Sequence, residues 1–285
     1  MRILQQRDAV LLIDLSNFVA RAIAVAQQDY LRLVLQMLLK LRRHYPHHRF
    51  VFAVEGAGTL RRQRLLPCYK EGRVPSPEFN EARQVAIQML RRIECQHIKA
   101  PDGEADDAIA TYVGQHPDDN CVIVSNDRDL WQLITPNCNV WATVKRNNVQ
   151  VDRFACRRLL GVDPKVVPLM KALLGDASDN IPRGVARVHK KKLLRLVNDS
   201  EGRVDQIPQL VQDAEYLTVK DKEKIILALP TVKQHLSVTI AWNNLSLKTR
   251  TCSGDVEALT RFLDHYGATT WTTVDEIEII VGMVK

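Results

Sequence analysis

The chain has 285 residues, of which 46% are hydrophobic and 26% charged, and 40 Lys and Arg against 33 Asp and Glu give a formal net charge of +7. This balance is typical of a globular protein and excludes disordered, collagen-like and disulfide-framework chains. No apolar run reaches the roughly 18 residues that a membrane span needs, and Asp14 breaks the apolar stretch from Ala9, so we expect a cytoplasmic protein without a signal peptide.

The first half of the chain alternates strand and helix patterns. Short apolar runs predict buried strands at 9–13, 49–54 and 121–125 and a fourth strand at 139–143. Amphipathic spacing predicts helices at 31–45, 77–94 and 104–113. Strands separated by helices predict an α/β fold, with a mostly parallel central sheet and helices on both faces.

The second half of the chain has a mainly helical pattern. Helices are predicted at 152–160, 163–174, 189–198, 203–215 and 219–229, and another at 255–266. We expect an α/β core over 1–151, a helical subdomain over 152–250 and a C-terminal helical tail over 251–285. No long flexible linker separates these parts, and we expect a monomer.

The six cysteines are scattered along the chain: Cys68, Cys95, Cys121, Cys138, Cys156 and Cys252. They form no C-x-x-C motif, and no Cys/His spacing suits zinc. We therefore expect reduced thiols, most of them buried in or beside strands and helices.

Carboxylates follow three of the predicted strands. Asp14 ends the first, Glu55 ends the second, and Asp127 and Asp129 lie just past the third. One acid after a strand is usually a helix N-cap or a turn residue. Functional groups gather at the carboxyl ends of strands in open α/β sheets, so three acids there indicate a shared site.

Two further segments supply acids. Glu104, Asp106 and Asp107 open a predicted helix, where the helix dipole alone would favour them. Asp176 and Asp179 are three residues apart and would share one face of a helical turn, although a polar turn between helices also explains them.

These segments together contribute nine carboxylates. Two like charges about 5 Å apart repel by ~0.8 kcal/mol in water and by ~3 kcal/mol at an effective dielectric near 20. A convergent group of this size needs cations, and an all-oxygen site suits Mg²⁺ or Mn²⁺. Two such ions are the usual arrangement for in-line phosphoryl displacement.

Two basic segments lie beside the acids in the sequence. Segment 60–73 contains Arg61, Tyr69, Lys70 and Arg73, which can hold a phosphate or, for Tyr69, stack on a base. Segment 183–192 carries five Lys and Arg and no acid, and a helix start there can bind phosphate. The ordinary alternative for both is a solvated surface helix. A pI near 9.1 also favours a polyanionic partner.

These segments resemble the structure-specific 5′ nucleases, the flap endonuclease family that includes the 5′-nuclease domain of bacterial DNA polymerase I and stand-alone phage 5′→3′ exonucleases. The matching pieces occur in the same order: LLIDLSNFVARA (11–22), FAVEGAG…R…YKEGR (52–73), GEADDAIATYV (103–113), VIVSNDRDLWQLI (122–134) and GDASDNIPRGV (175–185). The resemblance covers about residues 8–250 and implies a PIN-like nuclease core with a helix-turn-helix variant in the helical subdomain.

The resemblance also implies roles for individual residues. A first metal ion would be surrounded by Asp14, Glu55, Glu104, Asp106 and Asp107, and a second would be held, partly through waters, by Asp127, Asp129, Asp176 and Asp179. Lys70 and Arg73 would contact the scissile phosphate at the base of a helical arch over about 60–94. The implied DNA-binding residues are Arg21, Arg61, Tyr69, Lys70, Arg73, Arg183, Gly184, Val185, Arg187, Lys190, Lys191 and Lys192.

Two positions depart from the family pattern. Glu55 stands where Asp is usual, and Glu can still bind a metal ion. The family turn reads G-V-x-G-I-G-x-K, but Arg187 and His189 replace its later two glycines. Because glycine permits positive φ and close backbone approach, this loss argues for an altered duplex-binding turn and against the K⁺ ion that often accompanies it.

The resemblance implies a nuclease that uses two Mg²⁺ ions, with Mn²⁺ as a substitute. It would cut 5′-flap, nicked or branched duplex DNA in replication and repair, both as a flap endonuclease and as a 5′→3′ exonuclease. Two alternatives remain open. A PIN-like RNA-cleaving nuclease would not need the duplex-binding turn, and a non-catalytic DNA-binding replication accessory protein would not need the full set of acids.

Overall fold

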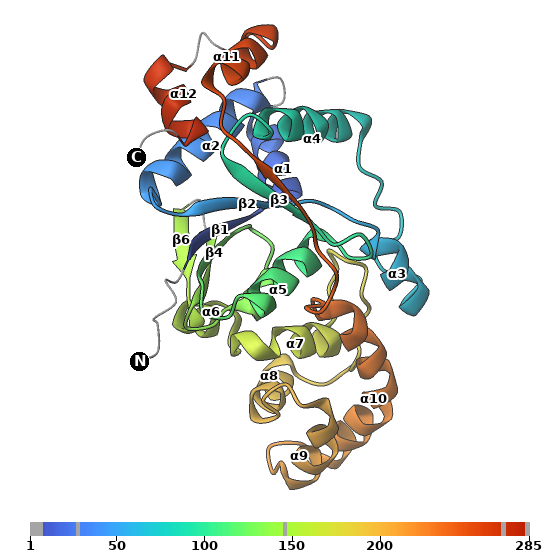
Figure 1. Cartoon of the computed structure of the whole chain (residues 1–285). Helices are drawn as coiled ribbons and strands as arrows, with labels where there is room; N and C mark the ends of the chain where they lie inside the picture. The colour runs from blue at the N-terminus through green and yellow to red at the C-terminus, as the bar shows by residue number, and fades with distance from the viewer. Residues whose placement is uncertain (1–7, 27–28, 145–146, 269–271, 283–285) are drawn as a thin grey trace, which may run out of the picture.

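Seven strands form one sheet in the order β6-β5-β4-β1-β2-β3-β7 (Figure 1). The computed structural model describes residues 8–26, 29–144, 147–268 and 272–282. Residues 1–7 of the predicted core and residues 283–285 of the predicted C-terminal tail therefore lie outside the described residues. The strands are β1 (Ala9–Asp14), β2 (Arg49–Ala53), β3 (Cys95–Lys99), β4 (Asn120–Val124), β5 (Cys138–Val144), β6 (Asn147–Val151) and β7 (Lys248–Cys252).

The five central strands run parallel, and the edge strands β6 and β7 run antiparallel to their neighbours. β1 is almost wholly apolar because helices cover the sheet on both faces. Parallel pairing places the carboxyl ends of β1, β2 and β4 at one edge of the sheet. Asp14 lies opposite Ala53 there, and Ile13 lies opposite Val124.

Five helices pack on one face of the sheet (Figure 1). They are α1 (Leu15–Val25), α2 (Tyr30–His44), α4 (Pro77–Leu90), α11 (Val256–His265) and α12 (Val274–Val281). Side chains alternate along a strand, so Leu11 and Ile13 of β1 face these helices together with Phe50 and Phe52 of β2. The two C-terminal helices therefore complete the core of the sheet that the N-terminal helices begin.

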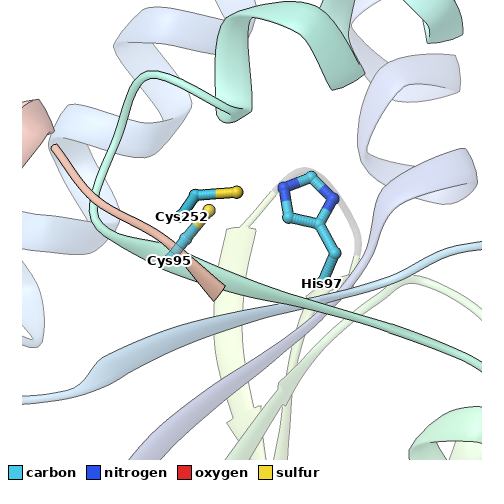
Figure 2. A group of neighbouring side chains, drawn as sticks. All are labelled: Cys95, His97 and Cys252. Atoms are coloured by element: carbon cyan, nitrogen blue, oxygen red, sulfur yellow. The ribbon is translucent and has the colours of Figure 1, made fainter. Parts of the chain in front are cut away.

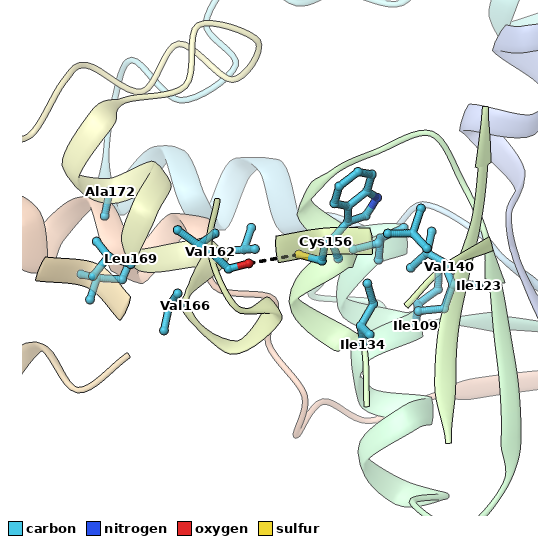
Figure 3. Close-up of a cluster of buried hydrophobic side chains, with 14 of the residues drawn as sticks. Ile109, Ile123, Ile134, Val140, Cys156, Val162, Val166, Leu169 and Ala172 are labelled. Atoms are coloured by element: carbon cyan, nitrogen blue, oxygen red, sulfur yellow. Dashed lines mark hydrogen bonds between the residues drawn. The ribbon is translucent and has the colours of Figure 1, made fainter. Parts of the chain in front are cut away.

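The opposite face carries the other helices. They are α5 (Ala105–Gln115), α6 (Arg153–Leu160), α7 (Val167–Leu174), α8 (Lys190–Asp199), α9 (Ile207–Asp213) and α10 (Val219–Thr239), with 3₁₀ turns at Asp129–Leu133, Pro164–Val166 and Val204–Gln206. One hydrophobic cluster runs from Leu12 and Ile123 in the sheet through Leu169 to Ile225 in α10. Figure 3 shows part of this cluster, from Ile109 and Ile123 to Leu169 and Ala172. Continuous packing fixes the helical region relative to the sheet.

Helix α3 (Gly58–Leu65) lies beside α10 rather than on the sheet (Figure 1). The Arg62 Nε donates to the Val238 carbonyl at 3.1 Å, and the Gln234 amide donates to the Leu65 carbonyl at 2.8 Å. Residues 66–76 connect α3 to α4, so the predicted arch region comprises most of α3, this connection and α4.

The predicted fold class is confirmed, and the helix predictions match the observed helices in place. Strands β3, β6 and β7 were not predicted, because their polar residues interrupt any apolar run; four of the five residues of β7 are exposed. The helix predicted to end near Pro230 continues to Thr239, since Val232 and Val238 are buried in the core. Among the described residues, no helix is both long and apolar enough to cross a membrane.

Candidate active site

Asp14 lies where β1 meets α1, at the carboxyl edge of the sheet. Its carboxylate accepts the Asn17 amide as the N-cap of α1, and it also accepts the Ser125 hydroxyl, both at 3.1 Å. Burial, with the charges of Glu55 and Asp127, raises the pKa of Asp14 to about 7. Asp14 is therefore the N-cap of α1, as the ordinary interpretation predicts. It is also a buried carboxylate that lies close to Glu55 and Asp127.

Glu55 and Glu104 extend this group. The Glu55 carboxylate accepts the Ala105 amide at 3.1 Å, and burial together with the charge of Glu104 raises its pKa. Glu104 accepts the Tyr69 hydroxyl at 2.9 Å and the Lys70 ammonium at 3.0 Å. Although burial alone would raise the pKa of Glu104, the nearby Lys70 and Arg62 charges lower it.

Asp106 connects the acids of the strand ends. Burial, with the charges of Asp127 and Asp14, raises its pKa well above the usual value. Asp14, Asp106 and Asp127 come from three segments that are far apart in the sequence, and their charges act on one another here. The predicted convergence of these acids at the carboxyl edge of the sheet is therefore present.

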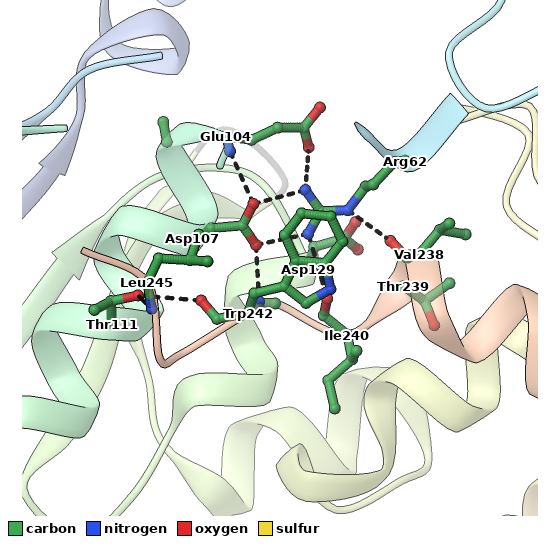
Figure 4. A network of polar contacts seen from close by, with 12 residues as sticks. Arg62, Glu104, Asp107, Thr111, Asp129, Val238, Thr239, Ile240, Trp242 and Leu245 are labelled. Atoms are coloured by element: carbon green, nitrogen blue, oxygen red, sulfur yellow. Dashed lines mark hydrogen bonds and ion pairs between the residues drawn. The ribbon is translucent and has the colours of Figure 1, made fainter. Parts of the chain in front are cut away.

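Asp107 lies in a different setting from its neighbours in α5 (Figure 4). It is fully buried, and its two oxygens accept Arg62 nitrogens at 2.6 and 2.7 Å. The same carboxylate accepts the backbone amides of Glu104 and Trp242, each at 2.8 Å. All these contacts saturate the carboxylate, which anchors α3 and the segment between α10 and β7 onto the start of α5.

A second acidic group lies beside the first. Carboxylate oxygens of Asp129, Asp176 and Asp179 lie within 4.8 Å of one another. The Lys171 ammonium pairs with Asp129 and, at 2.5 Å, with Asp176. This lysine, from α7, places a positive charge where the acids meet, which is the position that a cation would take.

The turn after α7 shapes this group. Gly175 has a φ of +79°, and a Cβ there would come within 2.8 Å of the Arg183 amide nitrogen, so glycine is required. Asp176 accepts the Ser178 amide at 2.9 Å and hydroxyl at 2.5 Å. Burial opposes ionisation of Asp176, but Lys171 and Ser178 lower its pKa.

Lys70 and Arg73 lie between the two acidic groups. Lys70 pairs with Glu104 of the first group, and Arg73 pairs with Asp179 of the second at 3.4 Å. Lys70 has a left-handed φ of +48°, which is uncommon for lysine, and its backbone amide donates to the Asp179 carbonyl at 2.9 Å. The connection after α3 is therefore held directly against the acids.

Three other predicted DNA-binding residues have different surroundings. Tyr69 is 2% exposed and donates its hydroxyl to Glu104, which contradicts the expectation that its ring stacks on a base. Its buried ring instead packs in a small hydrophobic cluster with Leu66, Ile181 and Val238. Arg61 is exposed, with its guanidinium 4.4 Å from the centre of the Trp242 ring. Arg21 donates to the Thr143 hydroxyl at 2.9 Å.

The basic turn before α8 has a left-handed backbone at one of the two positions where the resemblance leads us to expect glycine. Arg187 has a φ of +58°, so the left-handed conformation persists without glycine. His189 has an ordinary φ of −63° and caps α8 by accepting the Lys191 amide at 3.3 Å. Gly184 packs so closely that a Cβ would lie 2.3 Å from the Ala172 carbonyl oxygen. Of the two residues at these positions, Arg187 therefore has the left-handed backbone and His189 does not.

The basic side chains of this turn divide into two sets. Arg183 donates to the Val185 and Val188 carbonyls, both at 2.7 Å, and Lys192 pairs with Asp221 at 2.6 Å, so both stabilise the protein itself. Val185 is fully buried. Arg187, Lys190 and Lys191 are exposed at the start of α8, where the helix dipole disfavours positive charge.

A pocket of about 740 Å³ joins the second acidic group to this basic turn. Asp127, Lys171 and Asp176 line one part of it, and Arg183 and Lys190 line another. The same pocket is therefore lined by acidic and basic side chains, a combination that suits a phosphate chain beside metal ions.

Sequence reasoning missed Arg62 and Lys171 as members of the site. Arg62 was one arginine within a basic run, and Lys171 was one lysine in a helix, and both patterns are typical of solvated side chains. Arg62 is instead 2% exposed. Only its pairing with Asp107, 45 residues away, distinguishes it.

Comparisons with known proteins show which family this chain resembles. A family model described as 5′-3′ exonuclease, N-terminal resolvase-like domain, matches residues 9–158. The chain is 26% identical over 253 residues to a 5′-3′ exonuclease of Buchnera aphidicola subsp. Baizongia pistaciae, covering 84% of this chain and 82% of that protein. It is 29% identical over 242 residues to DNA polymerase I of Lactococcus lactis subsp. cremoris, covering 80% of this chain but 27% of the polymerase.

A solved structure shares the fold. The bacteriophage T5 flap endonuclease, in a pseudo-enzyme-product complex with DNA and metal ions, aligns over 95% of this chain and 99% of its own with a TM-score of 0.67 and 17% identity. The family model covers more than half of the 285 residues. From this match and the convergent acids, the chain belongs to the 5′-3′ exonuclease family, whose members are hydrolytic nucleases.

Proposed function

We propose that this chain is a 5′ nuclease that hydrolyses phosphodiester bonds in 5′-flap, nicked or branched duplex DNA with the help of two Mg²⁺ ions. The observation that carries the proposal is the meeting of Asp14, Asp106 and Asp127 at one sheet edge, where burial and the charges of neighbouring acids raise the pKa values of Asp14 and Asp106. A buried group of carboxylates is stable only with compensating cations.

The donor set supports two metal positions. Asp14, Glu55, Glu104 and Asp106 would hold the first ion, and Asp127, Asp129, Asp176 and Asp179 the second. All the donors are oxygens, which suits Mg²⁺, with Mn²⁺ as a substitute. We assign Asp107 to positioning Arg62 and α5 rather than to direct metal contact, because its two oxygens already accept four hydrogen bonds.

The protein side chains would orient the substrate. Bound Mg²⁺ would supply an activated water and offset charge on the phosphate. Lys70 and Arg73 stand between the two acidic groups, so they would contact the scissile phosphate. The arch predicted over about 60–94 would hold the 5′ strand above them.

Exposed positive charge on the helical part supports duplex binding. Arg187, Lys190 and Lys191 would contact phosphates through charge alone, with Arg183, Gly184, Val185 and Lys192 shaping the turn. Because Arg187 and His189 replace the two later glycines of the family turn, we do not assign a K⁺ ion to it. We also propose that the protein acts in the cytoplasm and as a monomer.

A double variant tests the proposal. Replacing Asp127 and Asp129 together by Asn removes two charges while keeping their size, and should reduce Mg²⁺-dependent cleavage of a labelled 5′ flap at least a hundredfold while preserving flap binding. Asp264→Asn, an exposed acid of α11, is the matched control. Undiminished cleavage by the double variant would reject the assignment.

The substrate panel separates the alternatives. Nicked, blunt and 5′-flap DNA should be compared with a matched RNA flap, with and without Mg²⁺. A preference for RNA would favour an RNA-cleaving enzyme over the proposed one. Failure of calorimetry to detect Mg²⁺ or Mn²⁺ binding at millimolar concentrations would favour a non-catalytic DNA-binding protein.

A further inference from the structure

Two cysteines and a histidine meet on the neighbouring strands β3 and β7. Cys95 lies at the amino end of β3, whereas the acids lie at the carboxyl ends of the parallel strands. Cys95 is the first residue of β3, and His97 is two residues further, so both side chains lie on the same face of the strand. Cys252 is the direct register partner of Cys95 on the antiparallel strand β7. Antiparallel pairing thus brings together residues that are more than 150 positions apart.

The three side chains form a compact group. Their sulfur and ring nitrogen atoms lie within 4.8 Å of one another. Cys95 is 3%, Cys252 6% and His97 8% exposed. Figure 2 shows both sulfurs and one ring nitrogen of His97 directed toward the same space.

His97 provides a second, independent observation. Its Nε2 is buried and has no hydrogen-bond partner among the residues that the structure describes. An unpaired buried nitrogen is destabilising, whereas an imidazole nitrogen is an ordinary metal ligand.

We propose that Cys95, His97 and Cys252 bind a thiophilic divalent metal ion such as Zn²⁺. Sulfur and imidazole donors select this class of ion, whereas the carboxylates of the active site select Mg²⁺. Zinc takes sulfur at about 2.3 Å and nitrogen at about 2.0–2.1 Å, so the ligand atoms of a tetrahedral shell lie about 3.3–3.8 Å apart. Side-chain movements of about 1 Å would therefore close the site around the ion.

The charges balance when the ion binds. Each thiol loses its proton to solvent, and two thiolates neutralise one divalent ion. The three side chains leave one coordination position for a fourth donor.

The position of the group indicates a structural purpose. β7 is an edge strand with four exposed residues, and it carries the chain from the helical region back to α11. A metal ion bound to both β3 and β7 would fasten this edge strand to the sheet. The site is thus independent of the proposed nuclease chemistry.

Cobalt spectroscopy tests the proposal on the full-length protein. After reduction and removal of metal, Co²⁺ should produce one equivalent of thiolate-to-cobalt charge-transfer absorption, which carboxylate ligands do not produce, and Zn²⁺ should displace it. Cys252→Ser should abolish this absorption, and His97→Phe should weaken Co²⁺ binding at least tenfold. Cys156→Ser, at a buried cysteine of α6, is the matched control and should leave it unchanged.

The Asp127→Asn, Asp129→Asn double variant should keep the charge-transfer absorption, which separates this site from the active site. Circular dichroism checks that each variant folds, and the wild-type titration alone remains decisive if Cys252→Ser does not fold. No charge-transfer absorption in the wild type, or unchanged absorption in folded Cys252→Ser, would overturn the proposal. A Cys95–Cys252 disulfide in the unreduced protein together with no thiolate-bound Co²⁺ after reduction would replace it with a redox pair.

Discussion

Each acid of the site differs in the groups that face it. Asp107 has Arg62, and Asp129 and Asp176 share Lys171. The pKa of Asp14, in contrast, is raised by burial and by Glu55 and Asp127. A metal ion would stabilise the acids that face other acids directly, whereas at Asp129 and Asp176 it would have to displace the Lys171 ammonium.

Lys171 competes with a metal ion for the second acidic group. Replacing it by Met should lower the stability of the metal-free protein by about 1.5–3 kcal/mol, because charged hydrogen bonds to Asp129 and Asp176 are lost. The same variant should bind Mn²⁺ more tightly, because no ammonium has to leave. Urea denaturation in EDTA and Mn²⁺ titration calorimetry measure the two effects.

The control for this prediction is Lys165→Met, whose lysine pairs with Glu201 on the surface. It should leave Mn²⁺ binding unchanged and alter stability by less than about 1 kcal/mol. Weaker Mn²⁺ binding by Lys171→Met would show that the lysine supports the metal position instead of competing for it.

Among the helices, α8 and α10 are joined at their starts. Thr218 and Asp221 form a capping box at the N-terminus of α10, and Asp221 also accepts the Lys192 ammonium at 2.6 Å. This pair fastens the end of the basic turn to α10. The hydrogen bond from Lys192, aided by the contacts of Thr218, lowers the pKa of Asp221 to about 2.

Asp221→Asn should destabilise the protein by roughly 1 kcal/mol at pH 7, since the exchange keeps an acceptor for the Thr218 amide but removes the charge facing the partly exposed Lys192. A carboxylate with a lowered pKa stabilises the folded state above its ordinary pKa and loses that contribution as the pH falls toward its folded value. The difference between variant and wild type should therefore shrink from pH 4 toward pH 2 in urea denaturation. A difference independent of pH would show that the charge of Asp221 plays no part.

For the whole molecule, the parallel sheet determines where charge gathers. Parallel strands direct several carboxyl ends to one edge, and segments from both halves of the chain bring acids to it. The hydrophobic cluster that joins sheet and helical region holds Asp176 and Asp179 against the strand-end acids. The fold thus stores repulsion at its active site that a divalent cation would relieve.

Mg²⁺ should raise the melting temperature by several degrees at millimolar concentration, and by more at pH 7.5 than at pH 5.5. The folded pKa of Asp14, about 7, lies above its ordinary value, so the folded protein holds that proton more tightly than the unfolded chain. Its stability contribution therefore falls as the pH rises from about 4 to 7, and protons compete with Mg²⁺ in the same range. Differential scanning calorimetry measures this, with NaCl of equal ionic strength as the control. A shift equal at both pH values would contradict shared sites for protons and metal.

Much of this protein followed from local sequence patterns. Apolar runs and amphipathic spacing depend on neighbouring residues, so β1, β2, β4, β5 and most helices could be predicted, together with the α/β class. Acids placed after strands could be expected to converge, because parallel strands share an edge.

Only the tertiary structure decided which polar and charged side chains meet. Arg62 with Asp107, Lys171 with Asp129, and Cys95 with Cys252 are pairs of residues far apart in the sequence, and no local pattern distinguishes their members from solvated or buried side chains. Tyr69 likewise became a buried ring rather than an exposed one because the chain folds over it. The physical reason is that hydrophobic patterning depends on each residue's own segment, whereas the partner of a buried polar group depends on how distant segments pack.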